Sequence, residues 1–138
     1  MSEAPFVCTI NNLAYDEMRP QSTDLPLGRW VVYPEVIPGR KKAEEIEVIR
    51  QTRSPYVRGL VVYQVGSDES AWVKIGWDMP GVPGTTNIVN VETSHPEIIA
   101  TLDGFIGLNE TESITVTVVD AREQPTRNGN GPGKSADG

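Results

Sequence analysis

Residues that could perform catalysis are few and scattered in this 138-residue chain. The single cysteine, Cys8, and the single histidine, His95, are too few to make a zinc set or an internal disulfide. A Ser–His–Asp triad assembles in space, but no Gly-x-Ser-x-Gly elbow and no P-loop are present. His95 precedes a proline, which favours a solvated or turn-forming residue, and Cys8 alternates with Phe6 and Ile10, which favours a buried thiol. We therefore expect no enzyme, no metal and no cofactor.

Binding by aromatic side chains is the other chemistry that the sequence offers. Trp77 alternates with Val73 and Ile75, so a place in the core is the better interpretation for it. Trp72 lies on the opposite face of the same strand with Lys74, which makes it the better candidate for an exposed aromatic. These two tryptophans are thus expected on opposite faces of one strand.

Two further aromatic residues and an aspartate complete this set. Trp30 shares a strand face with Val32, and a core position and a binding position are equally open for it. Tyr56 lies in a proline-containing loop, where packing explains an aromatic less easily. Asp78 suits a turn into Pro80, where it could form local hydrogen bonds with no function implied.

These side chains must be positioned by the most strongly patterned stretch of the chain, Gly59–Glu92. Two strand-like runs, Leu60–Val65 and Ala71–Trp77, flank a polar turn, and a loop rich in proline and glycine leads to a third run, Asn87–Glu92. Val73, Ile75 and Trp77 share one face, so this meander is expected to bury one face and leave the other wet.

The remaining strands are read from the same patterns. Predicted strands lie at Phe6–Ile10, Gly28–Tyr33, Glu97–Leu102 and Ser113–Ala121, and Leu13–Pro26 is expected to be irregular. Glu44–Arg50 suits either a helix or a strand, and its short length and Pro/Gly-rich flanks favour a strand. In the last strand, Ile114, Val116 and Val118 should face inward.

The fold class follows from this count and spacing of strands. We predict an all-β protein, a single antiparallel β-sandwich of about seven or eight strands. Residues 1–122 form the predicted β-sandwich domain, and residues 123–138 form a predicted disordered tail because their composition cannot bury enough apolar area.

Charge and hydropathy exclude several classes of partner. Twelve basic and nineteen acidic residues give a net charge of −7, which disfavours nucleic acid and anionic lipid but not a zwitterionic surface. No window approaches the length of a membrane-spanning helix, and the N-terminus lacks the basic and apolar regions of a signal peptide. We expect synthesis in the cytosol without a signal peptide.

Three segments carry a family resemblance: Gly28–Trp30, Arg58–Asn87 and Ser113–Val119. Their order of features is a tryptophan strand near residue 30, a strand-turn-strand hairpin that begins with glycine, the step Trp77-Asp78-Met79-Pro80, and a late Thr/Val strand. This order resembles the aegerolysin family, and within it most closely the small component of bacterial binary insecticidal toxins. More distantly it is similar to actinoporins and fungal fruit-body lectins.

The resemblance implies a β-sandwich that binds membrane lipids, in sphingolipid, sterol or glycolipid domains, and often acts with a larger pore-forming protein at target-cell membranes. It places lipid recognition at Trp30, at the loop Ser54–Tyr56 and at Trp77-Asp78, to which the strand pattern adds Trp72. Our first hypothesis is thus a non-enzymatic lipid-binding protein of the cytolysin or toxin type. The alternative is a soluble carbohydrate- or protein-binding module of the same fold, and an enzyme is the least favoured.

Overall fold

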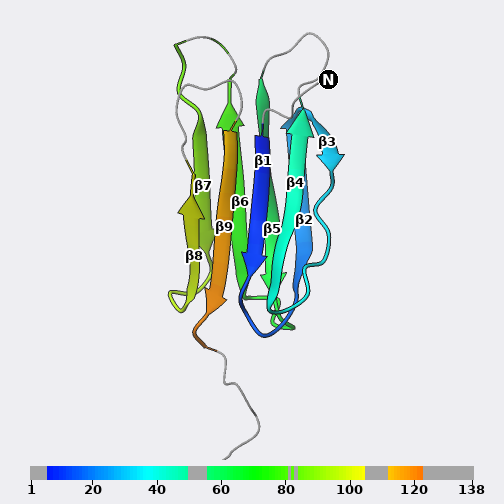
Figure 1. Ribbon diagram of the computed structural model, residues 1–138, viewed down its shortest axis with the longest axis vertical. Helices are drawn as coiled ribbons and strands as arrows, with labels where there is room; N and C mark the ends of the chain where they lie inside the picture. Colours follow the sequence, from blue (N-terminus) through cyan, green and yellow to red (C-terminus); the bar gives the residue numbers. More distant parts are fainter. Residues whose placement is uncertain (1–5, 50–55, 81, 83, 105–111, 123–138) are drawn as a thin grey trace, which may run out of the picture.

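The computed structural model describes residues 6–49, 56–80, 82, 84–104 and 112–122. In these residues the chain forms nine β-strands in two stacked sheets (Figure 1). The five-stranded sheet has the order β3-β4-β1-β9-β8, and the four-stranded sheet has the order β2-β5-β6-β7. The strands are β1 (Phe6–Asn12), β2 (Met18–Leu27), β3 (Arg29–Val32), β4 (Lys41–Ile49), β5 (Val57–Val65), β6 (Trp72–Met79), β7 (Ile88–Thr93), β8 (Ile98–Asp103) and β9 (Glu112–Asp120).

The predicted all-β sandwich is confirmed, with nine strands in the described residues where about seven or eight were predicted and with one difference in how the strands pair. β1 pairs with β9 in the parallel direction, while the other strand pairings of the described residues are antiparallel. The predicted tail, residues 123–138, lies outside the described residues.

The prediction of an irregular Leu13–Pro26 is wrong, because β2 occupies Met18–Leu27. Pro20 and Pro26 disfavour a strand, since proline has no N–H to donate to a ladder. Among the named strands of the described residues, however, β2 is an edge strand that pairs with β5, and its first residue, Met18, also bridges Ile37. Its register shifts between Pro20 and Ser22 and again between Asp24 and Leu27, so the ladder accommodates both prolines at irregularities.

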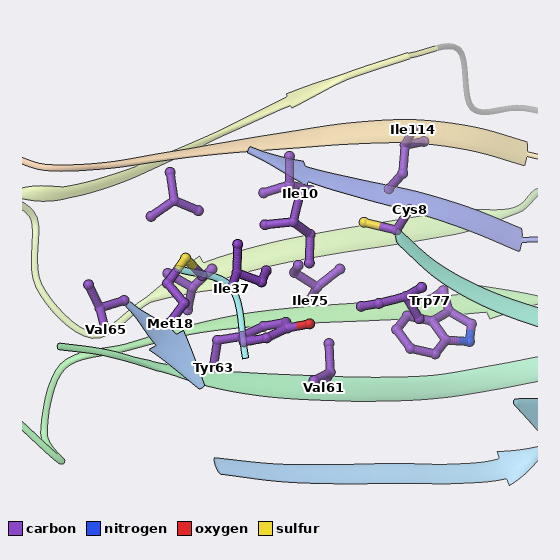
Figure 2. Close-up of a cluster of buried hydrophobic side chains, with 14 of the residues drawn as sticks. Cys8, Ile10, Met18, Ile37, Val61, Tyr63, Val65, Ile75, Trp77 and Ile114 are labelled. Atoms are coloured by element: carbon purple, nitrogen blue, oxygen red, sulfur yellow. The ribbon is translucent and has the colours of Figure 1, made fainter. Parts of the chain in front are cut away.

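The two sheets bury one face each against a common core. The period-two pattern predicted for the central meander is confirmed, because Val73, Ile75 and Trp77 are buried. The inward set predicted in β9, Ile114, Val116 and Val118, is buried as well. Figure 2 shows the core between the sheets, with Trp77 toward one end of the buried cluster and Met18 and Val65 toward the other.

Cys8 confirms the prediction of a buried thiol. Its side chain is fully buried in β1, in the same cluster as Ile10 and Ile114 (Figure 2). Burial raises the pKa of the Cys8 thiol to about 12, because the thiolate would lose its hydration. The protonated, unreactive form therefore prevails at neutral pH.

A glycine opposite a tryptophan brings β2, β5 and β6 into close contact. Gly59 of β5 lies directly across from Trp77 of β6. A Cβ atom at Gly59 would come within 2.9 Å of the Trp77 ring, and within 2.8 Å of the Asp24 carbonyl oxygen on β2. No residue with a side chain fits there without displacing backbone, so Gly59 is set by packing.

The topology separates two ends of the sandwich. β5 begins and β6 ends at one of them, which we call the loop end (Figure 1). β9 ends at the opposite end, which we call the tail end (Figure 1). β6 runs from Trp72 at the tail end to Met79 at the loop end. The position of a residue along β6 therefore decides which end of the sandwich it lies near.

Candidate binding surface

Four aromatic side chains form a ladder from the core to the surface near the loop end. Phe6 and Trp77 stack with their ring centroids 4.6 Å apart. Trp30 makes edge contacts with Trp77 at 5.9 Å and with Tyr33 at 5.3 Å. Exposure rises from 2% at Trp77 to 51% at Tyr33, with Trp30 half-buried between them. A rigid core ring thus supports an exposed aromatic at the sheet edge.

The outer member of this ladder is held by a second contact. The Tyr33 hydroxyl lies 3.0 Å from the Thr23 hydroxyl on β2. Tyr33 follows β3, a four-residue edge strand whose one neighbour among the described strands is β4. The contact spans the two sheets, because β2 and β3 are edge strands of different sheets. Tyr33 is therefore restrained although it is exposed, which lowers the entropy lost when a partner binds it.

Tyr56 and Asp78 join the start of β5 to the end of β6. The Tyr56 hydroxyl donates a hydrogen bond to Asp78 Oδ1 at 2.6 Å. That bond is the main reason the pKa of Tyr56 is raised above its usual range, since the protonated phenol donates to the carboxylate. Asp78 is thus a residue of β6 whose hydrogen-bond partner, Tyr56, directly precedes the neighbouring strand β5. The interpretation of Asp78 as the cap of a turn into Pro80 is wrong.

Exposed apolar side chains occur at both ends of the sandwich. Near the loop end, Val31 and Val82 are each 51% exposed and Ile88 is 49% exposed. At the tail end, Leu13 and Val36 are each 45% exposed. Apolar exposure alone does not choose between the ends, and the aromatic ladder is found at the loop end.

The structure gathers most of the predicted site residues there but not all. Trp30, Tyr56, Trp77 and Asp78 lie near the loop end, and Ser54 lies outside the described residues. Trp77 belongs to the core, so it supports this surface from beneath. Its indole Nε1 is buried and has no hydrogen-bond partner in the described part of the chain.

Trp72 is separated from the other predicted site residues. It starts β6 at the tail end and is half-buried, less exposed than the sequence suggested. Its backbone N–H donates to the Ser94 hydroxyl at 2.8 Å, which ties β6 to the turn after β7. Trp72 does not belong to one surface with Trp30 and Tyr56.

Sequence reasoning missed Tyr33, Val31 and Val82 as surface residues. The available signal was the run of apolar residues from Trp30 to Val36, which is interrupted by Pro34 and Glu35. Such a run on a buried strand would be core, and only the edge position of β3 leaves it exposed.

The one histidine forms part of a turn at the tail end, as predicted. Ser94 Oγ lies 2.7 Å from His95 Nδ1, and the His95 carbonyl accepts hydrogen bonds from Thr93 Oγ1 and the Ile98 N–H. Asp120, the buried carboxylate nearby, is held by Arg122 at 2.8 Å, and this contact keeps its pKa below the usual range. Within the described residues, no three His, Cys, Asp or Glu side chains are grouped to hold a metal ion.

Comparison by sequence finds no matching family model and no matching curated protein. Comparison with solved structures finds the RahU protein, crystallised with a Tris molecule, at a TM-score of 0.69 and 12% identity over 83% of this chain and 91% of RahU. IP-1A from Alcaligenes faecalis matches at a TM-score of 0.64 and 17% sequence identity, over 85% of this chain and 93% of IP-1A. The lipid binding protein Nakanori matches at a TM-score of 0.66 and 10% sequence identity, over 86% of this chain and 71% of Nakanori.

These likenesses show that the chain shares the fold of the three proteins. They support the resemblance to the aegerolysin family at the level of the fold. The described residues contain no helix with the length and hydrophobicity needed to cross a bilayer.

Proposed function

We propose that this protein is a non-enzymatic member of the aegerolysin family that binds membrane lipids through the loop end. The observation that carries the proposal is the aromatic ladder, which runs from the buried Trp77 through Trp30 to the exposed Tyr33. Aromatic rings suit the zone between lipid headgroups and acyl chains, since one end is apolar and the other tolerates water. The shared fold with a lipid-binding protein adds support.

Charge indicates which lipids this surface would take. The net charge of −7 opposes attraction to anionic membranes. Binding would rest on burial of the apolar side chains and on hydrogen bonds to a zwitterionic or glycosylated headgroup, which need no positive patch. Sphingolipid, sterol or glycolipid domains are the membranes of choice under this proposal.

Vesicle co-sedimentation tests the proposal with a matched pair of variants. The double variant Val31→Ser/Val82→Ser removes apolar contact near the loop end, and Leu13→Ser/Val36→Ser removes side chains of similar exposure at the tail end. Burying one aliphatic side chain stabilises by about 1.5–3 kcal/mol at most, so partial burial of two valines corresponds to a roughly tenfold change in affinity. Both variants should keep the wild-type melting temperature, because the replaced side chains are exposed.

The expected result is about a tenfold loss of binding to phosphatidylcholine–sphingomyelin–cholesterol vesicles for the loop-end variant alone. Equal losses in both variants would move the surface away from the loop end. A wild-type protein that sediments with no vesicle of any composition would overturn the lipid proposal in favour of a soluble carbohydrate- or protein-binding module.

The cytolytic role and the partner are part of the same proposal. The resemblance to the small component of binary toxins supports action with a larger pore-forming protein, at target-cell membranes and after release from the producing cell. This chain alone should therefore bind vesicles without releasing an entrapped dye. Dye release by the isolated protein would refute the need for a partner.

A further inference from the structure

A hollow of about 460 Å³ lies on the outer face of the four-stranded sheet, away from the core. The register of β5, β6 and β7 sets three rows of outward side chains across this face. The middle row has Leu60 on β5, Gly76 on β6 and Asn90 on β7. Gly76, at the centre of that row, lines the hollow without a side chain to fill it.

Packing does not require a glycine at position 76. A Cβ atom there would have its nearest neighbours at 3.8 and 3.9 Å, which is ordinary contact, and the backbone has no positive φ. This contrasts with Gly59 across the sheet, where a Cβ atom would meet three atoms within 2.9 Å. Glycine weakens the interior of a strand and often marks a place where a ligand approaches the backbone closely.

The rows on either side line the hollow with hydrogen-bonding groups. One row carries Arg58 and Asp78, and the other carries Lys74 and Glu92, which form an ion pair at 3.4 Å. Three of the lining side chains make no hydrogen bond or ion pair with the described part of the chain, and these are Asp24, Arg58 and Asn90. Donors and acceptors therefore face the hollow without partners.

The lining also has an apolar part. Leu60 and Pro26 contribute to it at the β2 and β5 side of the hollow, and Trp77 also lines the hollow. The volume falls within the range of about 300–1,000 Å³ that is typical of small-molecule sites.

We propose that this hollow, the Gly76 groove, binds a neutral sugar unit. Three carboxylates, Asp24, Asp78 and Glu92, against the two cations Arg58 and Lys74 leave the lining with a charge of −1, which opposes an anionic ligand. Sugar hydroxyls both donate and accept hydrogen bonds, so they match the interleaved carboxylate, amide and guanidinium groups. The apolar C–H face of the ring would lie on Leu60 and Pro26.

A free glycan and a glycolipid headgroup present the same chemistry to the groove. The glycolipid source rests on the proposed function, because the groove includes Asp78, which also accepts the hydrogen bond of Tyr56 near the loop end. The free-glycan source does not depend on membrane binding.

The test variant is Gly76→Val, which fills the groove with a β-branched side chain that suits a strand. Its melting temperature should equal or exceed that of wild type, given the space around position 76. Thr101→Val is the control, since Thr101 is exposed on β8 in the other sheet. Asn90→Ala, an exposed change in the groove, replaces Gly76→Val if the latter does not fold.

The primary assay is binding to an array of immobilised neutral monosaccharides and disaccharides. Wild type and Thr101→Val should bind the same sugars, and Gly76→Val should lose that signal about tenfold or more. If wild type binds no sugar on the array, or Gly76→Val binds as wild type does, the groove is not a sugar site.

A vesicle assay separates the two sources and the two proposals. Phosphatidylcholine–sphingomyelin–cholesterol vesicles contain no sugar, so Gly76→Val should bind them as wild type does. Added lactosylceramide should increase the binding of wild type and not of Gly76→Val if the source is a glycolipid. Sugar binding without vesicle binding would leave the groove in place and overturn the lipid proposal, whereas vesicle binding without sugar binding would do the reverse.

Discussion

Replacement of Trp77 by phenylalanine and by alanine separates the two contributions of its indole to stability. The ring is 2% exposed and stacks on Phe6 at 4.6 Å, while its N–H finds no partner in the described residues. Phenylalanine keeps an aromatic ring in the ladder and removes the N–H. Alanine removes both and leaves a cavity in the core.

The expected magnitudes differ severalfold. Trp→Ala in a core costs about 3–5 kcal/mol, and the lost contacts with Phe6 and Trp30 place Trp77→Ala toward the upper value. Trp77→Phe loses part of the ring area but no longer buries an unpaired donor, whose burial costs about 1–3 kcal/mol. The two terms oppose each other, so we expect a net loss below about 1.5 kcal/mol.

Thermal unfolding followed by circular dichroism measures both variants. At about 4 °C per kcal/mol for a chain of this size, Trp77→Phe should lower the melting temperature by at most about 6 °C and Trp77→Ala by about 12–20 °C. Trp72→Phe, outside the ladder, serves as the control and should stay within about 0.5 kcal/mol. If Trp77→Phe is as damaging as Trp77→Ala, the N–H makes a stabilising hydrogen bond and the reasoning is wrong.

Two further predictions concern β9 and the residues that follow it. Val116→Asp should abolish the soluble fold, because Val116 is fully buried, whereas Thr117→Asp on the outer face should lower stability little. Soluble yield and melting temperature compare the two variants. Equal effects would mean that the inner and outer faces of β9 are assigned the wrong way round. Arg122→Gln should move acid unfolding to higher pH, because Arg122 lowers the pKa of Asp120. A carboxyl whose pKa is lowered in the folded state stabilises the fold above its unfolded pKa of about 3.9, and this stability is lost as pH falls through the folded pKa. A pH titration of the circular dichroism signal should show the two proteins differing above about pH 4 and converging in stronger acid, and a difference that persists there would have another cause.

The fold could be predicted because period-two patterns report burial directly. In β6 and β9 branched or aromatic residues alternate mostly with polar or small ones, with Trp72 and Val119 as apolar exceptions on the outer faces, so the buried face could be assigned without knowing the neighbouring strands. β2 escaped prediction because its prolines are compatible with a strand only at a sheet edge. Edge position is a property of the sheet order, which a local pattern does not contain.

The candidate surface was predicted less well for a related reason. Trp72 and Trp77 are close in sequence, but five residues along an extended strand span about 16 Å, so they approach opposite ends of β6. Face assignment gave their orientation correctly and gave no information on position along the sandwich. Tyr33 was missed because its exposure depends on β3 being short and unpaired on one side.

The two strand glycines beside Trp77 show how packing separates a structural from a functional explanation. Gly59 faces inward and the indole ring, a β2 side chain and a β2 carbonyl occupy the place of its missing side chain, so the fold alone accounts for it. Gly76 faces outward and nothing of the described chain occupies the corresponding space. Compared with a β-branched residue, glycine at this position has a lower β-propensity and makes no side-chain contact with its cross-strand neighbours Leu60 and Asn90. No contact within the described chain requires glycine at position 76, which supports the proposal of a ligand at the Gly76 groove, and Gly76→Val tests that proposal without disturbing the core.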